Sequence, residues 1–422
     1  MTIRRNTSRR DFLIKGASFV ALGATVPLFL QNTVLAANKG RRGKRIKDGD
    51  RILVVLQLAG GNDGLNTIVP VTNDVYYAAR PKLAIKPADT LALNSDFAVH
   101  GKAVGLKRLF DDGHLGVIHG VGYPNPNRSH FKSTDIWSTA SPNGKQHDGW
   151  LGRYFDNTCR GEDPPDATTG IALMKESPLA MQGEHFMPLA FEKPESLNWT
   201  AAVRASSTGK VVTALNKPKR GDSENAETSH EFLRRVALEA RLSAEQIQAA
   251  TRGQKDNTRF PNSEIGRSLQ TVYRLIGADL NTRVYYLSHG GYDTHARQDN
   301  KHANLMRDLG EGLHGFVAAL KARGDLDRVT VMVFSEFGRR VAENGSGGTD
   351  HGAAAPMFVV GGKVKGGVHG AMPDMTKLDK GDLRFTTDFR NVYAAMLENW
   401  LKVDPAAILG GTFKPLDLIR SR

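Results

Sequence analysis

Acidic side chains and histidines follow three short apolar runs of the sequence, at residues 51–56, 284–287 and 331–334. Runs of β-branched and aromatic residues are typical of buried parallel strands, and open α/β sheets bind ligands at the carboxyl edge of such strands. Carboxylates and imidazoles are ligands of zinc and of harder divalent ions. If the three strands are neighbours, the sequence predicts a metal site at this edge that contains Asp63, Asp293, His295, Glu336 and His351.

The other histidines are interpreted differently. An acid beside a histidine is common in loops, so the combination of several strand ends carries the prediction rather than any one pair. Five histidines are interpreted as ordinary loop or core residues: His100, His114, His119, His314 and His369.

Ser129 lies at the start of a helix predicted after a strand at residues 115–121. Its hydroxyl either caps the helix, which would stabilise the helix by roughly 1 kcal/mol, or acts as a nucleophile. The unpaired N–H groups and the dipole of a helix N-terminus favour phosphate or sulfate there. Arg128 has the forked geometry that binds such an anion. Together with His130, these two residues are the candidate catalytic residues.

Helical and strand-like segments alternate along most of the chain. Further apolar runs at 115–121 and 356–362 are predicted strands, and amphipathic spacing predicts helices at 102–112, 149–157, 263–280, 302–320 and 389–401. This alternation predicts an α/β fold with a doubly wound, mainly parallel sheet.

Composition divides the chain into unequal parts. Residues 1–37 combine paired arginines, an apolar stretch and small residues, which predicts a twin-arginine signal peptide that is removed on export to the periplasm or beyond. The alternative is an amphipathic or membrane-anchored start that is not cleaved. Residues 38–50 form a basic flexible leader, and residues 51–422 form the folded domain. A polar, helical stretch at about 200–260 is expected to be an insertion, either a lid or a dimer arm.

The composition, net charge and cysteine count of the chain exclude several classes of function. With 40% hydrophobic and 24% charged residues the composition is that of a globular protein. The formal charge of +13 comes from scattered basic residues without a nucleic-acid-binding motif, so no nucleic-acid partner is expected. No stable membrane span is expected after cleavage, and the oligomeric state is left open. Cys159 is the only cysteine, which excludes an intramolecular disulfide and a thiolate metal cluster.

Several motifs together resemble the exported family called domain of unknown function 1501. They are the twin-arginine start, Gly-Gly-Asn-Asp-Gly-Leu-Asn at 60–66, Arg-Ser-His-Phe at 128–131, Gly-Trp-Leu-Gly-Arg at 149–153, Gly-Tyr-Asp-Thr-His at 291–295, Ser-Glu-Phe-Gly-Arg at 335–339 and Thr-Asp-His-Gly at 349–352. The family is grouped with the alkaline phosphatase and sulfatase superfamily. The resemblance implies an alkaline phosphatase-like sheet, a paired metal centre and hydrolysis of phosphate or sulfate esters.

The resemblance also implies roles for single residues. Asp63 matches the acid that bridges two metals, Ser129 matches the nucleophile, and Asp293 and His351 match ligands of the first metal. The sequence departs from the superfamily pattern at two places: Asp-x-x-x-His is replaced by Asp293-x-His295, and an Asp-His pair is replaced by Glu336-Phe337. Because phenylalanine cannot bind a metal, the second site has one ligand fewer.

Two functions are therefore considered. The first is an exported metal-dependent hydrolase that uses Zn, Mn, Mg or Ca ions, of unknown number, to cleave a small anionic ester. It would be exported by the twin-arginine export machinery. The second is a catalytically silent cell-envelope protein that binds an anionic ligand or partner. A third function, an exported redox enzyme, is suggested by the export route alone, and the sequence contains no haem, iron–sulfur or nucleotide motif.

Overall fold

The computed structural model describes residues 51–158, 167–194, 247–249, 251, 259–278 and 280–420. The expected signal peptide, the basic leader, Cys159 and nearly all of the expected insertion at 200–260 lie outside the described residues. Within the described part of the chain, no helix combines the length and the apolar composition that a membrane span requires.

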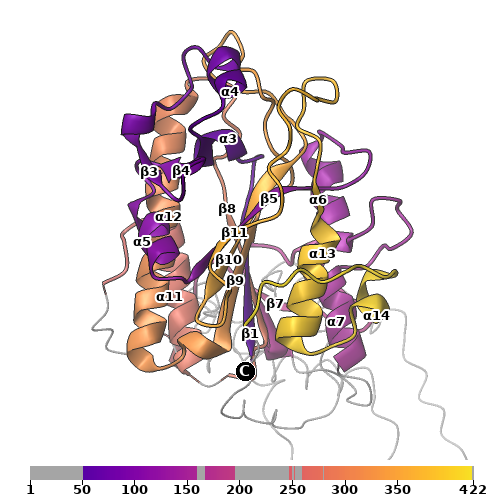
Figure 1. Ribbon diagram of the computed structural model, residues 1–422. Coiled ribbons are helices and arrows are strands. Elements are labelled where there is room, and N and C mark those ends of the chain that lie inside the picture. Colours follow the sequence, from indigo (N-terminus) through magenta and orange to yellow (C-terminus); the bar gives the residue numbers. More distant parts are fainter. Residues whose placement is uncertain are drawn as a thin grey trace, which may run out of the picture.

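A large mixed sheet forms the centre of the molecule (Figure 1). Its strands lie in the order β11-β5-β10-β9-β1-β8-β6-β7, with β12 also paired to β5. Only β10 runs antiparallel to its neighbours β5 and β9, and the other pairs are parallel. The bounds are β1 (Ile52–Leu58), β5 (Leu115–Gly122), β6 (Gly170–Leu173), β7 (Leu189–Ala190), β8 (Val284–His289), β9 (Val329–Phe334), β10 (Ala355–Gly361), β11 (Gly367–His369) and β12 (Thr387–Asp388).

Helices cover both faces of this sheet, as Figure 1 shows. One face carries α5 (Val104–Asp111), α11 (Glu264–Gly277) and α12 (Gln298–Arg323). The other carries α6 (His130–Thr139), α7 (Trp150–Thr158), α13 (Phe389–Ala394), the π-helical η6 (Ala395–Leu401) and α14 (Pro405–Leu409). The predicted doubly wound, mainly parallel α/β fold is confirmed.

The side chains of β1 explain why both faces are covered. All seven residues of this strand are buried. Ile52, Val54 and Leu56 belong to the core under α5, α11 and α12, whereas Leu53 and Val55 belong to the core under α6, α7 and α13. Successive side chains of a strand point to opposite faces, so a continuous apolar run requires a helix layer on each side.

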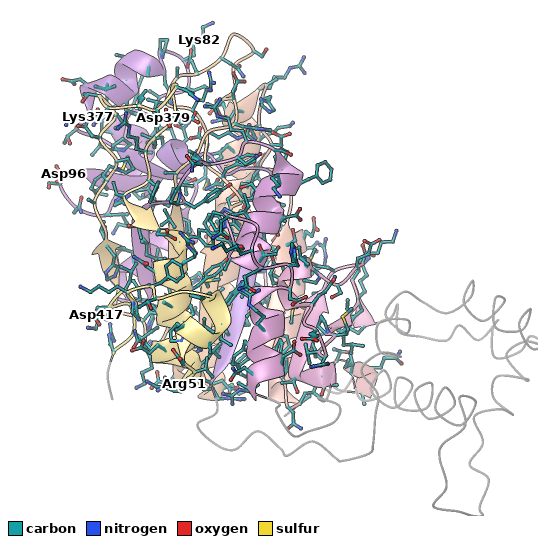
Figure 2. The ribbon with its side chains drawn as sticks, turned by 90° about the vertical axis from the view of Figure 1, so that its right-hand side faces the viewer. Arg51, Lys82, Asp96, Lys377, Asp379 and Asp417 are labelled. Carbon is teal, nitrogen blue, oxygen red and sulfur yellow. The ribbon has the colours of Figure 1, made fainter. Side chains whose placement is uncertain are left out.

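Smaller elements lie toward the carboxyl end of the central strands. They are α3 (Gly64–Thr67), α4 (Asp74–Ala79) and a three-stranded sheet of β2 (Ile68–Pro70), β4 (Phe97–His100) and β3 (Thr90–Ala92). In Figure 2, Arg51 at the start of β1 lies at one end of the molecule, and Lys82, Lys377 and Asp379 lie on loops at the opposite end. Because β1 starts beside Arg51, these loops lie toward the carboxyl end of the central strands (Figures 1 and 2).

Candidate metal centre

The three strands that carry the predicted ligands are neighbours. β1 lies between β8 and β9 and is parallel to both, so their carboxyl ends reach the same edge. The chain turns sharply after β1 at Gly60, whose φ of +123° is unfavourable for any residue with a side chain. A Cβ at Gly60 would overlap the backbone nitrogen of Asp293. The glycine therefore lets the loop after β8 approach the end of β1.

Three histidines surround the carboxylate of Asp293. The Nε2 atoms of His295 and His351 lie 3.1 and 3.2 Å from its Oδ1, and the Nε2 atom of His130 lies 3.6 Å from its Oδ2. The two Nε2 atoms of His295 and His351 are only 2.9 Å apart. The ligand atoms of His130, Asp293 and His351 all lie within 4.8 Å of one another, as in a group that could hold a metal ion.

The other ring nitrogen of each histidine is held by an acceptor. Nδ1 of His351 donates to the backbone carbonyl of Arg128 at 2.8 Å. Nδ1 of His130 lies 2.8 Å from Oε1 of Glu336, and Nδ1 of His295 lies 3.3 Å from Oδ1 of Asp350. A proton on Nδ1 leaves a lone pair on Nε2 of a neutral ring. Metal-binding histidines are oriented by second partners of this kind.

The electrostatics favour a charged Asp293 and a neutral His351. Partial burial of Asp293 opposes ionisation, but the hydrogen bond and positive charge of Arg339, together with the nearby His351, outweigh it and lower the pKa of this carboxyl to about 2. Burial lowers the pKa of His351 below its ordinary value, although the Arg128 carbonyl and Asp293 act in the opposite direction. At neutral pH the carboxylate oxygens and the Nε2 lone pair of His351 are therefore all acceptors.

A proton or a cation among these acceptors would remove the repulsion between them. Acceptors that face one another at about 3 Å repel unless a proton or a metal lies among them. An ion here would have His130, Asp293 and His351 as ligands, and the Nε2 atom of His295 lies 2.9 Å from that of His351. Imidazole and carboxylate are suitable ligands for zinc and similar transition metals, so the residues fit a divalent ion.

Asp63 does not join this group. It is fully buried at the end of β1, where its Oδ2 pairs with Nη1 of Arg80 at 2.7 Å and also accepts a hydrogen bond from Gln298. Burial alone would raise its pKa, but the attraction of Arg80 and these hydrogen bonds hold the pKa below its ordinary value. The carboxylate is ionised, and its charge is already balanced by a protein cation.

Glu336 contacts the cluster formed by His130, Asp293, His295 and His351 but is not part of it. Its side chain is buried, and its Oε1 accepts from the backbone nitrogen of Gly60 at 2.8 Å as well as facing His130. Phe337, which replaces a ligand in the superfamily pattern, is buried with its ring centroid 4.8 Å from that of His130 and 4.6 Å from that of His351. Glu336 and Phe337 therefore help to orient the rings of His130 and His351.

The candidate catalytic residues lie beside the cluster. Ser129 occupies the N-cap position of α6, but its side chain makes no cap hydrogen bond, and the residue is exposed. The structure therefore does not support the capping interpretation of its hydroxyl. Arg128 forms an ion pair with the buried Asp382, with Nη2 to Oδ2 at 2.6 Å. His130 faces Asp293, so the structure brings it to the candidate ligands.

Arg339 is a site residue that the sequence analysis missed. Its side chain is fully buried and donates to Oδ1 of Asp293 at 2.7 Å. It also donates to the carbonyl oxygens of Gly60, Gly61, Tyr292 and Thr349. One guanidinium thus joins the loops that follow β1, β8 and β9. Because Arg339 belongs to the motif at 335–339, the sequence could have identified it as a site residue. It was missed because a basic residue after a strand is usually exposed.

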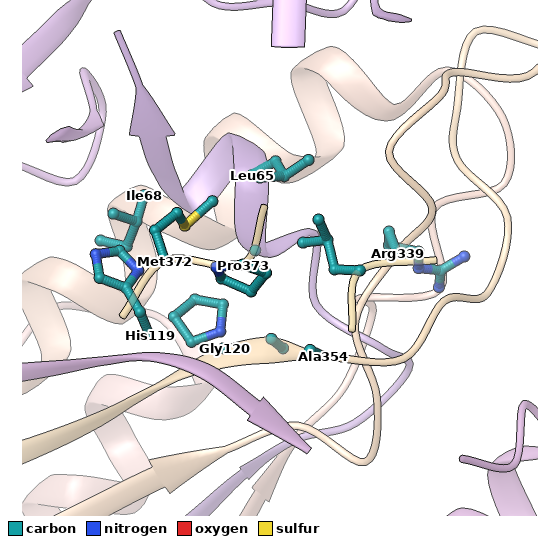
Figure 3. A pocket seen from close by; sticks show the side chains of 12 residues that line it. Leu65, Ile68, His119, Gly120, Arg339, Ala354, Met372 and Pro373 are labelled. Carbon is teal, nitrogen blue, oxygen red and sulfur yellow. The ribbon is translucent and has the colours of Figure 1, made fainter. Parts of the chain in front are cut away.

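A small cavity lies beside the cluster and has a different lining (Figure 3). Its volume is about 20 Å³, and its lining includes His119, Met372, Pro373 and Arg339. A cavity of this size holds roughly one water molecule. Ligand pockets are on the order of 300 Å³ or more, so a substrate would contact the exposed side of the cluster rather than enter this cavity.

Fold and site together define a class of protein: a doubly wound α/β protein with a histidine–aspartate cluster at the carboxyl edge of its sheet. The chain belongs to the family described as Protein of unknown function (DUF1501), whose family model matches residues 115–407. The family resemblance is confirmed. No curated protein matches the chain.

Two solved structures are similar to the chain at low identity. The PsFucS1 sulfatase from Pseudoalteromonas sp. is 10% identical, with 97% of this chain and 75% of that chain covered and a TM-score of 0.37. The lipoteichoic acid synthase LtaP from Listeria monocytogenes is 8% identical, with 90% and 79% covered and a TM-score of 0.34. Both TM-scores are low, so neither similarity carries an argument about the site.

Proposed function

We propose that this protein is a metal-dependent hydrolase of phosphate or sulfate esters, the activity that the family resemblance implies. One observation carries the proposal: the Nε2 atoms of three histidines converge on the ionised Asp293 while their Nδ1 atoms are held from behind. Asp293 and His351 would hold the ion, with His130 and His295 as further ligands. This imidazole-rich set favours zinc over manganese, magnesium or calcium.

The chain's own residues would then bind and cleave the ester. A divalent ion, when bound, polarises an ester oxygen and offsets the charge that develops on it. The Ser129 hydroxyl, exposed and free of a cap bond, would attack phosphorus or sulfur while the bond to the alcohol oxygen breaks, and the serine proton would pass to that alcohol oxygen. Water would then release phosphate or sulfate and restore the serine.

Access and charge support an anionic substrate. The side chains of Asp293 and His295 are 48% and 44% exposed, so a substrate can reach them from solvent. Ser129 begins a helix of ten residues, whose N-terminal N–H groups favour a bound anion. Arg128 is 35% exposed and lies next to Ser129 in the sequence, although its Nε and Nη2 atoms are already paired with Asp382.

Hydrolysis by metal-loaded protein tests the proposal. Purified full-length protein is expected to bind zinc and to hydrolyse an aryl phosphate or an aryl sulfate. His351→Ala and Asp293→Asn should remove metal and activity together. Ser129→Ala should retain metal and lose at least about 100-fold in rate, in line with the loss of a covalent nucleophile.

The exposed His147→Ala variant is the matched control and should behave as wild type. Metal binding without hydrolysis of either ester would favour the silent, anion-binding alternative. Equal hydrolysis by wild type, Asp293→Asn and Ser129→Ala would contradict the site assignment.

We also propose that the protein is exported by the twin-arginine route. Arg9 and Arg10 precede an apolar stretch, and this pattern matches that export signal. The route carries folded proteins, so an ion bound in the cytoplasm would be exported with the protein. Cell fractionation tests this location, and protein found only in the cytoplasm would contradict it.

A further inference from the structure

Gln298 connects the two loops that carry the candidate ligands. It is the first residue of α12 and is fully buried. Its Oε1 accepts hydrogen bonds from Oγ1 of Thr294 at 3.0 Å and from Oγ1 of Thr349 at 2.7 Å. Thr294 lies between Asp293 and His295 in the sequence, and Thr349 lies shortly before His351. A single carbonyl oxygen therefore ties together the segments that provide three of the four cluster residues.

The other end of the same amide is held by Asp63. Nε2 of Gln298 donates to Oδ2 of Asp63. Because an ionised carboxylate can only accept, this bond fixes the orientation of the amide and directs its oxygen to the two threonines. Both threonines and Asp63 are fully buried, so water does not compete for these bonds.

Arg80 in turn holds Asp63 in place. The guanidinium is fully buried, and besides Asp63 it donates to Oδ1 of Asn66 at 2.7 Å and to the carbonyl oxygens of Val341 and Arg340 at 2.8 and 2.9 Å. An ion beside Asp63 would have to displace a cation with four acceptors around it. Removing one partner of a buried charge pair is strongly unfavourable.

We propose that Asp63 anchors this buried network and is not an ion ligand, and that Gln298, Thr294 and Thr349 are positioning residues. They set the separation of Asp293 and His351 and thereby the affinity and geometry of the metal centre. The inference rests on the metal centre proposed above. It deepens that proposal in one respect: with Asp63 paired to Arg80, the metal centre binds one ion.

Isosteric threonine variants test the positioning role. Thr294→Val and Thr349→Val remove one hydroxyl each and keep the side-chain shape. Partners behind metal ligands typically contribute 10- to 100-fold to metal affinity, so each variant is expected to bind zinc at least about tenfold more weakly than wild type. The visible spectrum of cobalt-loaded protein, which reports ligand geometry, should also change.

Thr330→Val is the matched control. Thr330 is equally buried, lies near the start of β9 away from the carboxyl edge, and its hydroxyl has no partner among the described residues. This variant should bind zinc with wild-type affinity and give the wild-type cobalt spectrum. If the threonines had only a structural role, the variants would lower the stability of the metal-free protein. All three variants would then bind zinc with the same affinity.

The outcomes separate this inference from the proposed function. Wild-type zinc affinity and cobalt spectra in both Thr294→Val and Thr349→Val would overturn the positioning role, even if the enzyme hydrolyses esters. Metal binding that depends on the threonines in a protein without ester hydrolysis would support the inference and overturn the proposed function. Elemental analysis should find one equivalent of metal per chain. Two equivalents, with one lost in Asp63→Asn, would show that Asp63 is a ligand, and no bound metal would overturn both proposals.

Discussion

Gly60 shows how a single backbone position brings the site together. Its φ is +123°, and its Cα faces the backbone of the Asp293 loop so closely that a Cβ would overlap the nitrogen of Asp293. Its own nitrogen donates to Glu336, which orients His130. The loops after β1 and β8 can therefore approach each other at the site only because Gly60 has no side chain.

Gly60→Ala is expected to weaken both stability and metal binding. A residue with a side chain at this φ costs on the order of 1–3 kcal/mol, and relief of the overlap would move Asp293 away from the histidines. Urea unfolding and a zinc titration would measure the two effects. Gly290→Ala, in the same loop as Asp293 and with open space around its Cα, should change neither quantity. Equal metal affinity in the Gly60 and Gly290 variants would contradict this account.

At the scale of elements, the packing of α12 against α5 fixes where Gln298 lies. The two helices approach closely at Gly105 and Gly310, and a Cβ at Gly105 would overlap the backbone carbonyl of Gly310. Because α12 begins at Gln298, a shift of this helix would also shift the residue that joins the ligand loops.

Gly105→Ala is therefore expected to destabilise the protein by about 1–3 kcal/mol, the usual cost of overpacking. Gly315→Ala, on α12 itself, is the control. Its Cβ would meet the nearest atom, on Pro261, at an ordinary 3.4 Å. Since alanine favours a helix over glycine by up to about 1 kcal/mol, this variant should be as stable as wild type or more stable. Thermal or urea unfolding would measure both, and destabilisation of the same size in both variants would contradict the packing argument.

For the whole molecule, two buried histidines predict sensitivity to acid. Burial lowers the pKa of His119 to about 4, and it lowers the pKa of His302 to about 4 although the nearby Asp63 acts in the opposite direction. Nε2 of His119 and Nδ1 of His302 are buried and have no hydrogen-bond partner in the described part of the chain. Both rings are therefore neutral in the folded protein at neutral pH.

The sign of the effect follows from proton binding. An unfolded histidine takes up a proton near pH 6.5, whereas these folded ones do so near pH 4. Between these values the unfolded chain binds more protons, so the free energy of unfolding falls as the pH falls. Each group would contribute a loss of roughly 3 kcal/mol across this window.

Urea unfolding at several pH values would measure this loss. His119→Phe should flatten the dependence between pH 6.5 and 4, whereas the exposed His147→Ala should leave it unchanged. A slope that is the same in wild type and His119→Phe would show that His119 is not responsible.

Much of the fold could be predicted from the sequence because burial on both faces leaves a simple pattern. The continuous apolar run of β1 and the alternation of strands with amphipathic helices indicated a doubly wound sheet, and β8, β1 and β9 do lie side by side. The antiparallel direction of β10 could not be predicted, because a buried strand has the same apolar pattern in either direction.

The sequence by itself determined which residues had the chemistry for a metal site and which strand ends carried them, since carboxylates and imidazoles after buried strands are visible in the order of residues. Only the tertiary structure decided which of them meet. His130 reaches Asp293 from a helix on another part of the chain, and Asp63 is paired with Arg80 instead. The physical reason is that a charged side chain acts through the partner it contacts, and the paths of loops, which leave no periodic pattern in the sequence, decide that partner.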